Sequence, residues 1–381
     1  MQRHGATASR SPITVGLIFG GTGPEHEASL ASARSVLDHL DPDIYMVRQF
    51  GVSKDGKWLV GNGAWNELYL DSDDSLLPAT IRDFPSAAVI QEVSRHDCFP
   101  DSRAFNGLDC LFPLVHGVGG EDGSIRGFLE LTRLPIAGCS LLGCAQSYNK
   151  WTARRLSRDA GIPTVATIFV PAGEDPMQSG ERVCSEFGTW DAIVKPVSSG
   201  SSFGVSRITA PEHLVHALEE ARRYSADCLV EAFTPHRELF VALMGTGSNV
   251  IVSDPAMSPI MRSGLSTYHD KYIADEPPLR CPSGLSVSID QCAREIALAA
   301  YETLGCSGFA RVDLFACLST DRVWLNEVNA VPALAADCAF AAGMNKAGYS
   351  YPDLLAAIIG QSLRAAQPCP SLDRRQALPQ L

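Results

Sequence analysis

The stretch GFARVDLF at residues 308–315, with VWLNEVN at residues 323–329, decides the predicted fold. Side chains of a β-strand alternate between its two faces, so the first stretch places Arg311 and Asp313 on one face and its aliphatic residues on the other. The second stretch alternates in the same way, and a short polar turn joins the two. The pattern predicts a β-hairpin with one polar face and one apolar face.

The polar face of this hairpin predicts a metal site. We expect Leu325, Glu327 and Asn329 to share one face of the second strand, which brings Asp313, Glu327 and Asn329 together. Carboxylate and amide oxygens suit Mg²⁺, which keeps waters and completes its shell with substrate phosphates. A solvated edge hairpin, or a surface pair between Arg311 and a carboxylate, would give the same pattern. The apolar opposite face and the helical pattern before the hairpin favour the metal site.

Length and composition set the broad class of the protein. With 381 residues the chain is long enough for two or three packed units. Its formal net charge of −12 argues against a nucleic-acid surface, so a polyanionic ligand has to be met by local cations. No stretch approaches the roughly 20 uninterrupted apolar residues of a membrane-spanning helix, which argues against a membrane protein. The 12 cysteines lack C-x-x-C pairs, which favours reduced thiols and a cytoplasmic protein.

The order of the predicted strands and helices indicates a mixed α/β and α+β architecture. A β-rich run at residues 13–19, a glycine turn and a helical pattern at residues 27–40 predict a doubly wound N-terminal domain. We expect polar loops up to about residue 105 and a surface excursion at residues 171–188. The expected segments are a flexible N-terminus (1–12), an N-terminal α/β substrate domain (13–145), a central subdomain (146–234), a C-terminal subdomain with the metal site (235–364) and a flexible tail (365–381).

Two features predict a phosphate site in the central subdomain. Lys195 ends the buried strand pattern IVKP, and the small-residue loop SSGSSFGV follows it at residues 198–205. Backbone N–H groups of such a loop can surround phosphate oxygens. A flexible linker is the alternative interpretation, but the strands on both sides of the loop favour a phosphate loop.

The motifs RVD at residues 311–313 and NEVN at residues 326–329 resemble the paired signatures of the ATP-grasp superfamily, in the D-alanine–D-alanine ligase branch. The chain from about residue 13 to 363 follows the pattern of that family. The resemblance implies an ATP-grasp fold of three domains and an ATP-dependent ligase of peptidoglycan or specialised metabolite biosynthesis. Such a ligase joins a D-alanine-like amino acid to an amine through an acyl phosphate. ATP, two Mg²⁺ ions with Mn²⁺ as an alternative, small amino acid substrates and a homodimer are also implied.

The resemblance also assigns catalytic and substrate-side roles. Glu25, in the loop GGTGPEHEASL, would hold the ammonium group of the first amino acid, and Arg311 would stabilise the oxyanion of the tetrahedral intermediate. Ser201 and Tyr272 would join Glu25 in a hydrogen-bonded latch around this substrate. His116, in the segment HGVGGEDGS, is expected on the substrate side, with a structural histidine as the alternative.

ATP and the metal would be bound by residues from the central and C-terminal subdomains. The implied ATP-binding residues are Lys150, Lys195, Ser201, Ser202, Glu231, Glu238 and Lys271. The implied metal ligands are Asp313, Glu327 and Asn329. Lys271 and Tyr272 belong to a predicted lid that would exclude water from the acyl phosphate.

The sequence departs from the family pattern in three places. In the loop at residues 198–205, Ser199 stands where some members have an acidic residue, and Phe203 is a variant seen in the D-lactate-using branch. Asn149 replaces the aspartate that usually precedes the first lysine, which is expected to alter local support.

In the segment AVPALAADC, Ala333 and Cys338 stand where the family has a glycine and a serine that seat the second substrate, and Asp337 adds a negative charge. We therefore count Asp337 and Cys338 among the substrate-binding candidates. The hypothesis is a diverged second pocket, for an amine without a free carboxylate.

Three alternative functions remain at this point. One is a ligase of specialised metabolism with a D-amino acid donor and a non-standard amine acceptor. Another is a nucleotide-binding regulator without catalysis, against which the metal triad and the candidate phosphate-binding groups argue. A dinucleotide-dependent dehydrogenase is disfavoured because His26 occupies the third glycine position of the G-x-G-x-x-G pattern.

Overall fold

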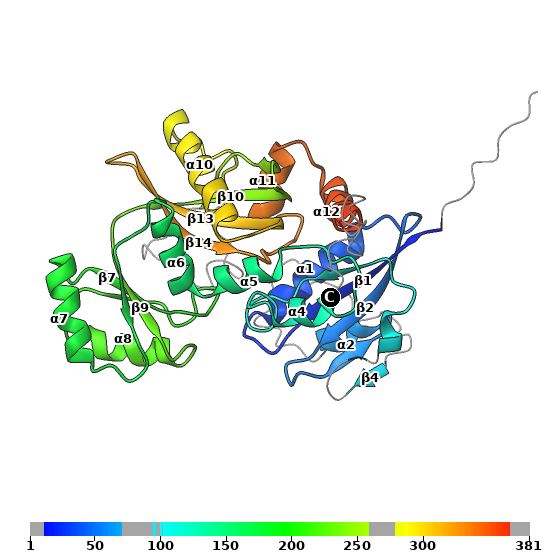
Figure 1. Ribbon diagram of the computed structural model, residues 1–381, viewed down its shortest axis with the longest axis horizontal. Coiled ribbons are helices and arrows are strands. Elements are labelled where there is room, and N and C mark those ends of the chain that lie inside the picture. Colours follow the sequence, from blue (N-terminus) through cyan, green and yellow to red (C-terminus); the bar gives the residue numbers. More distant parts are fainter. Residues whose placement is uncertain (1–10, 71–93, 97–99, 101, 259–278, 366–381) are drawn as a thin grey trace, which may run out of the picture.

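The computed structural model describes residues 11–70, 94–96, 100, 102–258 and 279–365, which contain three β-sheets (Figure 1). The predicted lid, with Lys271 and Tyr272, lies outside the described residues, as do most of the predicted flexible termini. Within the described residues, no helix is both long enough and apolar enough to cross a membrane.

The N-terminal sheet has five strands in the order β4-β3-β2-β1-β5. Its strands are β1 (Ile13–Gly20), β2 (Tyr45–Val52), β3 (Trp58–Val60), β4 (Ser94–His96) and β5 (Cys110–Pro113). Strands β2, β1 and β5 are parallel, as a doubly wound domain requires, while β3 and β4 continue the sheet antiparallel. The expectation of polar loops up to residue 105 was wrong, because β3, α2 (Ala64–Leu70) and a short 3-10 helix (Ser102–Phe105) lie there. Trp58 and Trp65 are buried and anchor this part of the chain.

The second sheet has four antiparallel strands in the order β6-β9-β7-β8. They are β6 (Thr167–Val170), β7 (Ala192–Pro196), β8 (Ser206–Ile208) and β9 (Cys228–Ala232), with helices α7 (Pro176–Phe187) and α8 (His213–Arg222). The segment at residues 171–188 lies at the surface as expected, but it contains helix α7. Asp175 caps α7 by accepting a hydrogen bond from the Met177 N–H, Pro176 opens the helix and Gly188 ends it in a left-handed conformation. These are ordinary helix start and stop signals.

The third sheet carries the hairpin and has the order β11-β10-β13-β14, with β12 paired to β10. Its strands are β10 (Arg237–Thr246), β11 (Asn249–Val252), β12 (Ala256–Met257), β13 (Gly308–Cys317) and β14 (Arg322–Asn329). Helix α10 (Val287–Thr303) packs its buried face, including Ile296 and Tyr301, onto the apolar side of this sheet.

The hairpin contains an irregularity that alternation did not predict. Asp313 pairs with Glu327, but the next pair is Leu314 with Leu325, so Asn326 has no partner across the hairpin. This β-bulge reverses the faces of the residues before it, because one extra residue shifts the alternation by one. The prediction that Leu325 shares a face with Glu327 was therefore wrong, and Leu325 lies in the apolar core.

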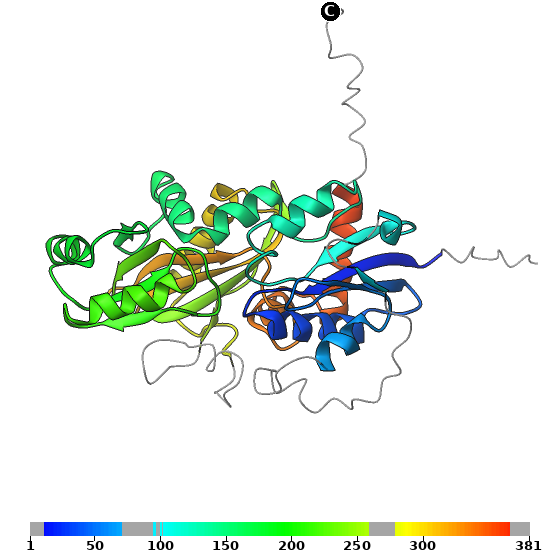
Figure 2. The ribbon, with the colours of Figure 1, turned by 90° about the horizontal axis from the view of Figure 1, so that it is seen from below.

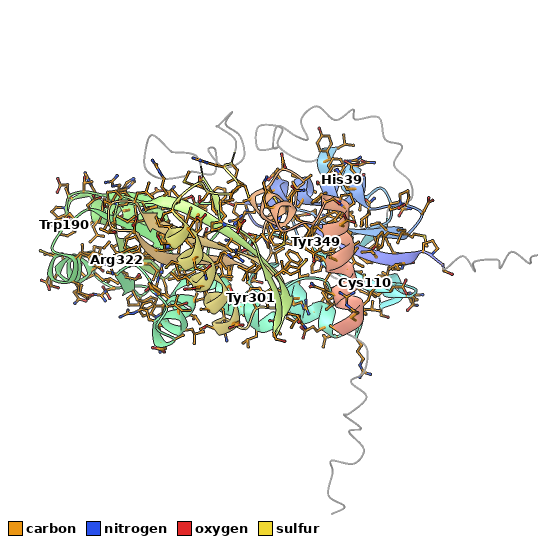
Figure 3. The ribbon with its side chains drawn as sticks, turned by 90° about the horizontal axis from the view of Figure 1, so that it is seen from above. His39, Cys110, Trp190, Tyr301, Arg322 and Tyr349 are labelled. Atoms are coloured by element: carbon orange, nitrogen blue, oxygen red, sulfur yellow. The ribbon has the colours of Figure 1, made fainter. Side chains whose placement is uncertain are left out.

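The remaining helices connect the sheets. They are α1 (His26–His39), α4 (Ser124–Glu130), α5 (Leu141–Tyr148), α6 (Lys150–Asp159), α11 (Ala339–Lys346) and α12 (Tyr351–Ala365). Figures 1 and 2 show α5 and α6 in succession between the N-terminal sheet and the two other sheets. Although it ends the described chain, α12 contacts β5 of the N-terminal sheet and the neighbouring helix α1. Figure 3 labels Cys110 of β5, His39 of α1 and Tyr349 near this helix.

Candidate active site

The polar face of the β13–β14 hairpin forms a shelf of charged residues. Asp313 lies opposite Glu327, and Arg311 lies opposite Asn329. The guanidinium of Arg311 donates to both carboxylate oxygens of Asp313, from Nε at 2.6 Å and from Nη2 at 2.7 Å. Glu327 is 3.2 Å from Lys150 Nζ, so α6 contributes a cation to the same shelf. The structure thus brings the three predicted metal ligands, Arg311 and Lys150 together.

The donor atoms of the shelf fit a hard divalent cation. Asp313 and Glu327 supply carboxylates from directly paired positions. The buried amide nitrogen of Asn329 has no hydrogen-bond partner among the described residues, and a rotation of the amide would present its oxygen instead. The described part of the chain holds no group of three or more His, Cys, Asp or Glu residues suited to a metal. Two carboxylates and an amide therefore match Mg²⁺, which takes few protein ligands and binds substrate phosphates.

A cleft lies beside the shelf, lined by residues of the second and third sheets. Its polar lining includes Glu327 of the shelf, and its apolar lining includes Val165, Ile193, Phe315 and Trp324. Six of the residues implied for ATP line this cleft, namely Lys150, Lys195, Ser201, Ser202, Glu231 and Glu238. An apolar slot that ends in cations is suited to a planar base with a polyphosphate.

Glu231, at the end of β9, is held between two buried cations. Its carboxylate is 2.5 Å from Arg154 Nη2 and 2.8 Å from Lys195 Nζ. Burial alone would raise the pKa of Glu231, but Lys195 and Arg154 together hold it below its usual value. Arg154, whose side chain also donates to the Leu325 carbonyl at 2.8 Å, could not be predicted from the sequence as a site residue. This triad ties α6, β7 and β9 to β14.

The loop after β7 joins the cleft to the N-terminal sheet through Glu25. Ser201 Oγ donates to Glu25 Oε1 at 2.5 Å. Ser201 and Ser202 have φ angles of 48° and 61°, a left-handed conformation that is costly for residues other than glycine. Lys150 Nζ also donates to the Ser199 carbonyl. The loop is thus held in a strained shape between the predicted ATP-binding lysine and the predicted ammonium-binding carboxylate.

His116 is buried and bonded to the protein through both ring nitrogens. Nδ1 lies 2.8 Å from the Val331 carbonyl, so it carries the proton, and Nε2 accepts from Ser32 Oγ at 3.0 Å. Burial lowers the pKa of His116 to about 4, which keeps the ring neutral. Ser32 in turn accepts from the Leu334 N–H at 3.1 Å. His116 therefore positions the segment that follows the shelf, in line with the structural alternative.

Glu121 and Tyr148 are site residues to which the sequence assigned no role. Burial first, and then the charge of Glu25, raise the pKa of Glu121 well above its usual value, against the opposing effect of Lys150. The Tyr148 hydroxyl is buried without a hydrogen-bond partner among the described residues. Burial and the charges of Glu121 and Glu25 raise the pKa of Tyr148. Glu121 was quoted only as part of a motif, and a tyrosine in α5 carries no local signal.

The candidates Asp337 and Cys338, in the segment after the shelf, lie in different environments. Cys338 is the first residue before α11, and its thiol donates to the Ala333 carbonyl at 2.8 Å. Burial raises the pKa of Cys338, so the thiol stays neutral. Asp337 is exposed to solvent. Asn149 accepts a hydrogen bond from the Thr152 N–H at 2.8 Å and caps α6.

Comparison with known proteins places the chain in one family. The family model described as D-ala D-ala ligase N-terminus matches residues 14–139, and that described as D-ala D-ala ligase C-terminus matches residues 156–360. A D-alanine–D-alanine ligase from Chlorobium phaeovibrioides is 33% identical, over 93% of this chain and 98% of that protein. D-alanine–D-alanine ligase A from Escherichia coli K12 is also 33% identical, over 92% of this chain and 96% of that protein.

Solved structures agree with these relatives. The VanG D-Ala:D-Ser ligase from Enterococcus faecalis superposes with a TM-score of 0.74 at 25% identity, covering 92% of this chain and all of that chain. The D-alanine–D-alanine ligase from Coxiella burnetii has the same TM-score and identity, covering 93% of this chain and 96% of that chain. The three sheets described above therefore form the ATP-grasp fold. The chain belongs to the D-alanine–D-alanine ligase family of ATP-dependent carbon–nitrogen ligases.

Proposed function

We propose that this chain activates a D-alanine-like amino acid as an acyl phosphate with ATP and transfers the acyl group to an amine. The observation that carries the proposal is the position of Glu25, a buried carboxylate that accepts a hydrogen bond from Ser201 at 2.5 Å beside the cleft and the shelf. A buried carboxylate can bind the ammonium group of an amino acid and fix where its own carboxylate points. The comparisons do not favour the regulator, the dehydrogenase or the specialised ligase considered from the sequence.

We assign the first step to the cleft and the shelf. The donor carboxylate attacks the γ-phosphorus of ATP, while Lys150 and Lys195 offset the charge of the phosphates. Mg²⁺ bound by Asp313, Glu327 and Asn329 would neutralise charge on the same phosphates. Lys150 contacts both the shelf and the loop after β7, which supports a role in aligning the two.

We assign the second step to Arg311 and Glu121. Arg311, oriented by its two bonds to Asp313, would stabilise the oxyanion that forms when the amine attacks the acyl phosphate. The attacking amine has to lose a proton. Glu121 is the candidate base, because its carboxyl interacts with the charges of Glu25, Lys150 and Arg311 around the same site.

Purified protein with ATP, Mg²⁺ and D-alanine is expected to release phosphate and form a product whose mass equals two alanines minus water. Phosphate release and mass spectrometry measure the two events, and L-alanine serves as the substrate control. A panel with D-serine, D-lactate and simple amines then identifies the acceptor. Absence of D-alanine-dependent phosphate release, in a folded protein that binds ATP, would contradict the proposal.

We also propose a homodimer in the cytoplasm. Exposed leucines around α4 and α5 support a contact with a second copy, with Leu131 80% and Leu142 57% exposed. Sedimentation velocity should give the mass of two chains, and Leu142→Glu should shift it toward one. The ten cysteines of the described ranges are all free, which supports a reducing compartment. Cell fractionation tests the location, and recovery of the protein outside the cytoplasmic fraction would contradict it.

A further inference from the structure

Three cysteines form a buried cluster behind the ends of the shelf strands, and the ligase reaction uses none of them. Cys139 follows Ile136, which pairs with Leu111 of β5. Cys144 lies on α5, and Cys306 precedes β13. They pack together with Ala330, the residue that follows Asn329. The cluster therefore joins three separate segments of the chain directly beside the shelf.

Cys139 and Cys306 meet across Gly143. A Cβ atom at Gly143 would lie 2.6 Å from Cys139 Sγ and 2.8 Å from Cys306 Cα, so a larger residue would displace one or both cysteines. Hydrogen bonds from the thiols of Cys144 and Cys306 lower the pKa of Cys139 well below its usual value. The Cys139 sulfur thus lies within hydrogen-bonding reach of the Cys306 thiol.

Cys306 is the most exposed member of the cluster. Cys139 and Cys144 are each 2% exposed, whereas Cys306 is partly exposed. The Cys306 N–H donates to the Tyr301 carbonyl at 2.9 Å, so Tyr301, labelled in Figure 3, marks the location. We therefore expect a small reagent such as hydrogen peroxide to reach the cluster from the side of Cys306.

We propose that Cys139 and Cys306 are a peroxide-oxidisable dithiol, and that their disulfide reversibly lowers the activity of the enzyme. The Cys139 thiolate attacks one oxygen of hydrogen peroxide, the O–O bond breaks, and hydroxide leaves to take up the proton that Cys139 released. The Cys306 sulfur then attacks the sulfenic sulfur of Cys139, the S–O bond breaks, and water leaves with the Cys306 proton. Two thiols are oxidised to one disulfide, and one peroxide is reduced to two waters.

The disulfide would act on the shelf through the two strand ends that flank the cluster. A disulfide requires a sulfur separation of about 2.05 Å, shorter than any contact between thiols. The segments are already fixed to each other, because Ser140 Oγ donates to the Gly305 carbonyl at 2.7 Å. Tightening them further shifts the start of β13, which carries Arg311, and Ala330 at the end of β14. The loss of activity rests on the proposed ligase function, whereas disulfide formation does not.

The test treats the full-length protein with a modest excess of hydrogen peroxide, followed by digestion without reductant and mass spectrometry. The expected result is a peptide pair joined through Cys139 and Cys306, together with a loss of phosphate release that dithiothreitol restores. The exposed Cys184 provides the control, because Cys184→Ser should leave both results unchanged. Oxidation confined to other cysteines, or a Cys139–Cys144 pair, would overturn the proposal.

Two variants separate the disulfide from general damage. Cys306→Ser should abolish both the cross-linked peptide and the reversible inhibition, while Cys144→Ser should retain both. Gly143→Ala, which displaces one or both cysteines without removing a thiol, should slow formation of the cross-link. A protein that forms the cross-link yet lacks ligase activity in the reduced state would refute the proposed function and leave the dithiol intact. Inhibition by peroxide that persists in Cys306→Ser would refute the dithiol.

Discussion

Glu231→Gln is expected to lower the free energy of unfolding by about 3–5 kcal/mol, because it leaves two buried cations without a counter-charge. The Glu231 side chain is 5% exposed, and those of Arg154 and Lys195 are 2% and 7% exposed. Glutamine keeps the shape of the side chain, so the change isolates the charge. Urea unfolding followed by circular dichroism measures the effect.

An exposed ion pair provides the matched control for Glu231→Gln. Arg34 and Asp38 are paired four residues apart on α1, and both side chains are about a quarter to a third exposed. Asp38→Asn should cost about 0.5 kcal/mol, since exposed pairs on helices contribute little. A second substitution, Lys195→Met, should recover part of the loss in Glu231→Gln by removing one unpaired cation. Equal effects of Glu231→Gln and Asp38→Asn would show that the triad is not a buried charge network.

Much of the fold could be predicted from the spacing of apolar residues, which repeats about every two residues in strands and about every 3.6 residues in helices. The hairpin, the strand at residues 13–19 and the helix at residues 27–40 were predicted close to their observed bounds, because each is long or strongly periodic. Short elements such as β3 were missed, since three residues carry too little periodicity. The bulge at Asn326 could not be predicted, because it depends on how β13 and β14 pair rather than on either strand alone.

Some residues of the candidate site could be predicted from the sequence, and others depend on how distant segments pack. Residues in recognisable motifs, such as Lys195 and Glu327, could be proposed from the sequence and lie together in the structure. Arg154 could not, because an arginine in an amphipathic helix ordinarily faces solvent, and only the packing of α6 on β9 and β14 buries it. For His116 the motif predicted a role on the substrate side. In the structure, both of its ring nitrogens form hydrogen bonds with other residues of the protein.

Gly200→Ala is expected to lower kcat/KM for the donor amino acid by about 10²-fold, because displacing a positioned group by a fraction of an ångström to 1 Å can have that effect. A Cβ atom at Gly200 would lie 2.5 Å from Glu25 Oε1 and 2.6 Å from Oε2, so the carboxylate has to move. The φ angle of Gly200 is not in the left-handed region, so alanine adds no backbone strain there. Most of the loss should appear as a higher KM for D-alanine, with the KM for ATP little changed.

Gly119→Ala is the control for Gly200→Ala. It adds backbone strain but no contact with Glu25, whereas Gly200→Ala adds the contact but no strain. Gly119 has a φ of +88°, and a Cβ atom there would meet nothing within 4 Å, so alanine strains the backbone without touching Glu25. Gly119→Ala should therefore cost about 1 kcal/mol of stability while the KM for D-alanine stays near that of the unmodified protein. Initial-rate kinetics with D-alanine, together with thermal unfolding, separate the two. If both variants raised the KM for D-alanine equally, loop strain rather than contact with Glu25 would be the cause, and the assignment of Glu25 to the donor ammonium would lose its support.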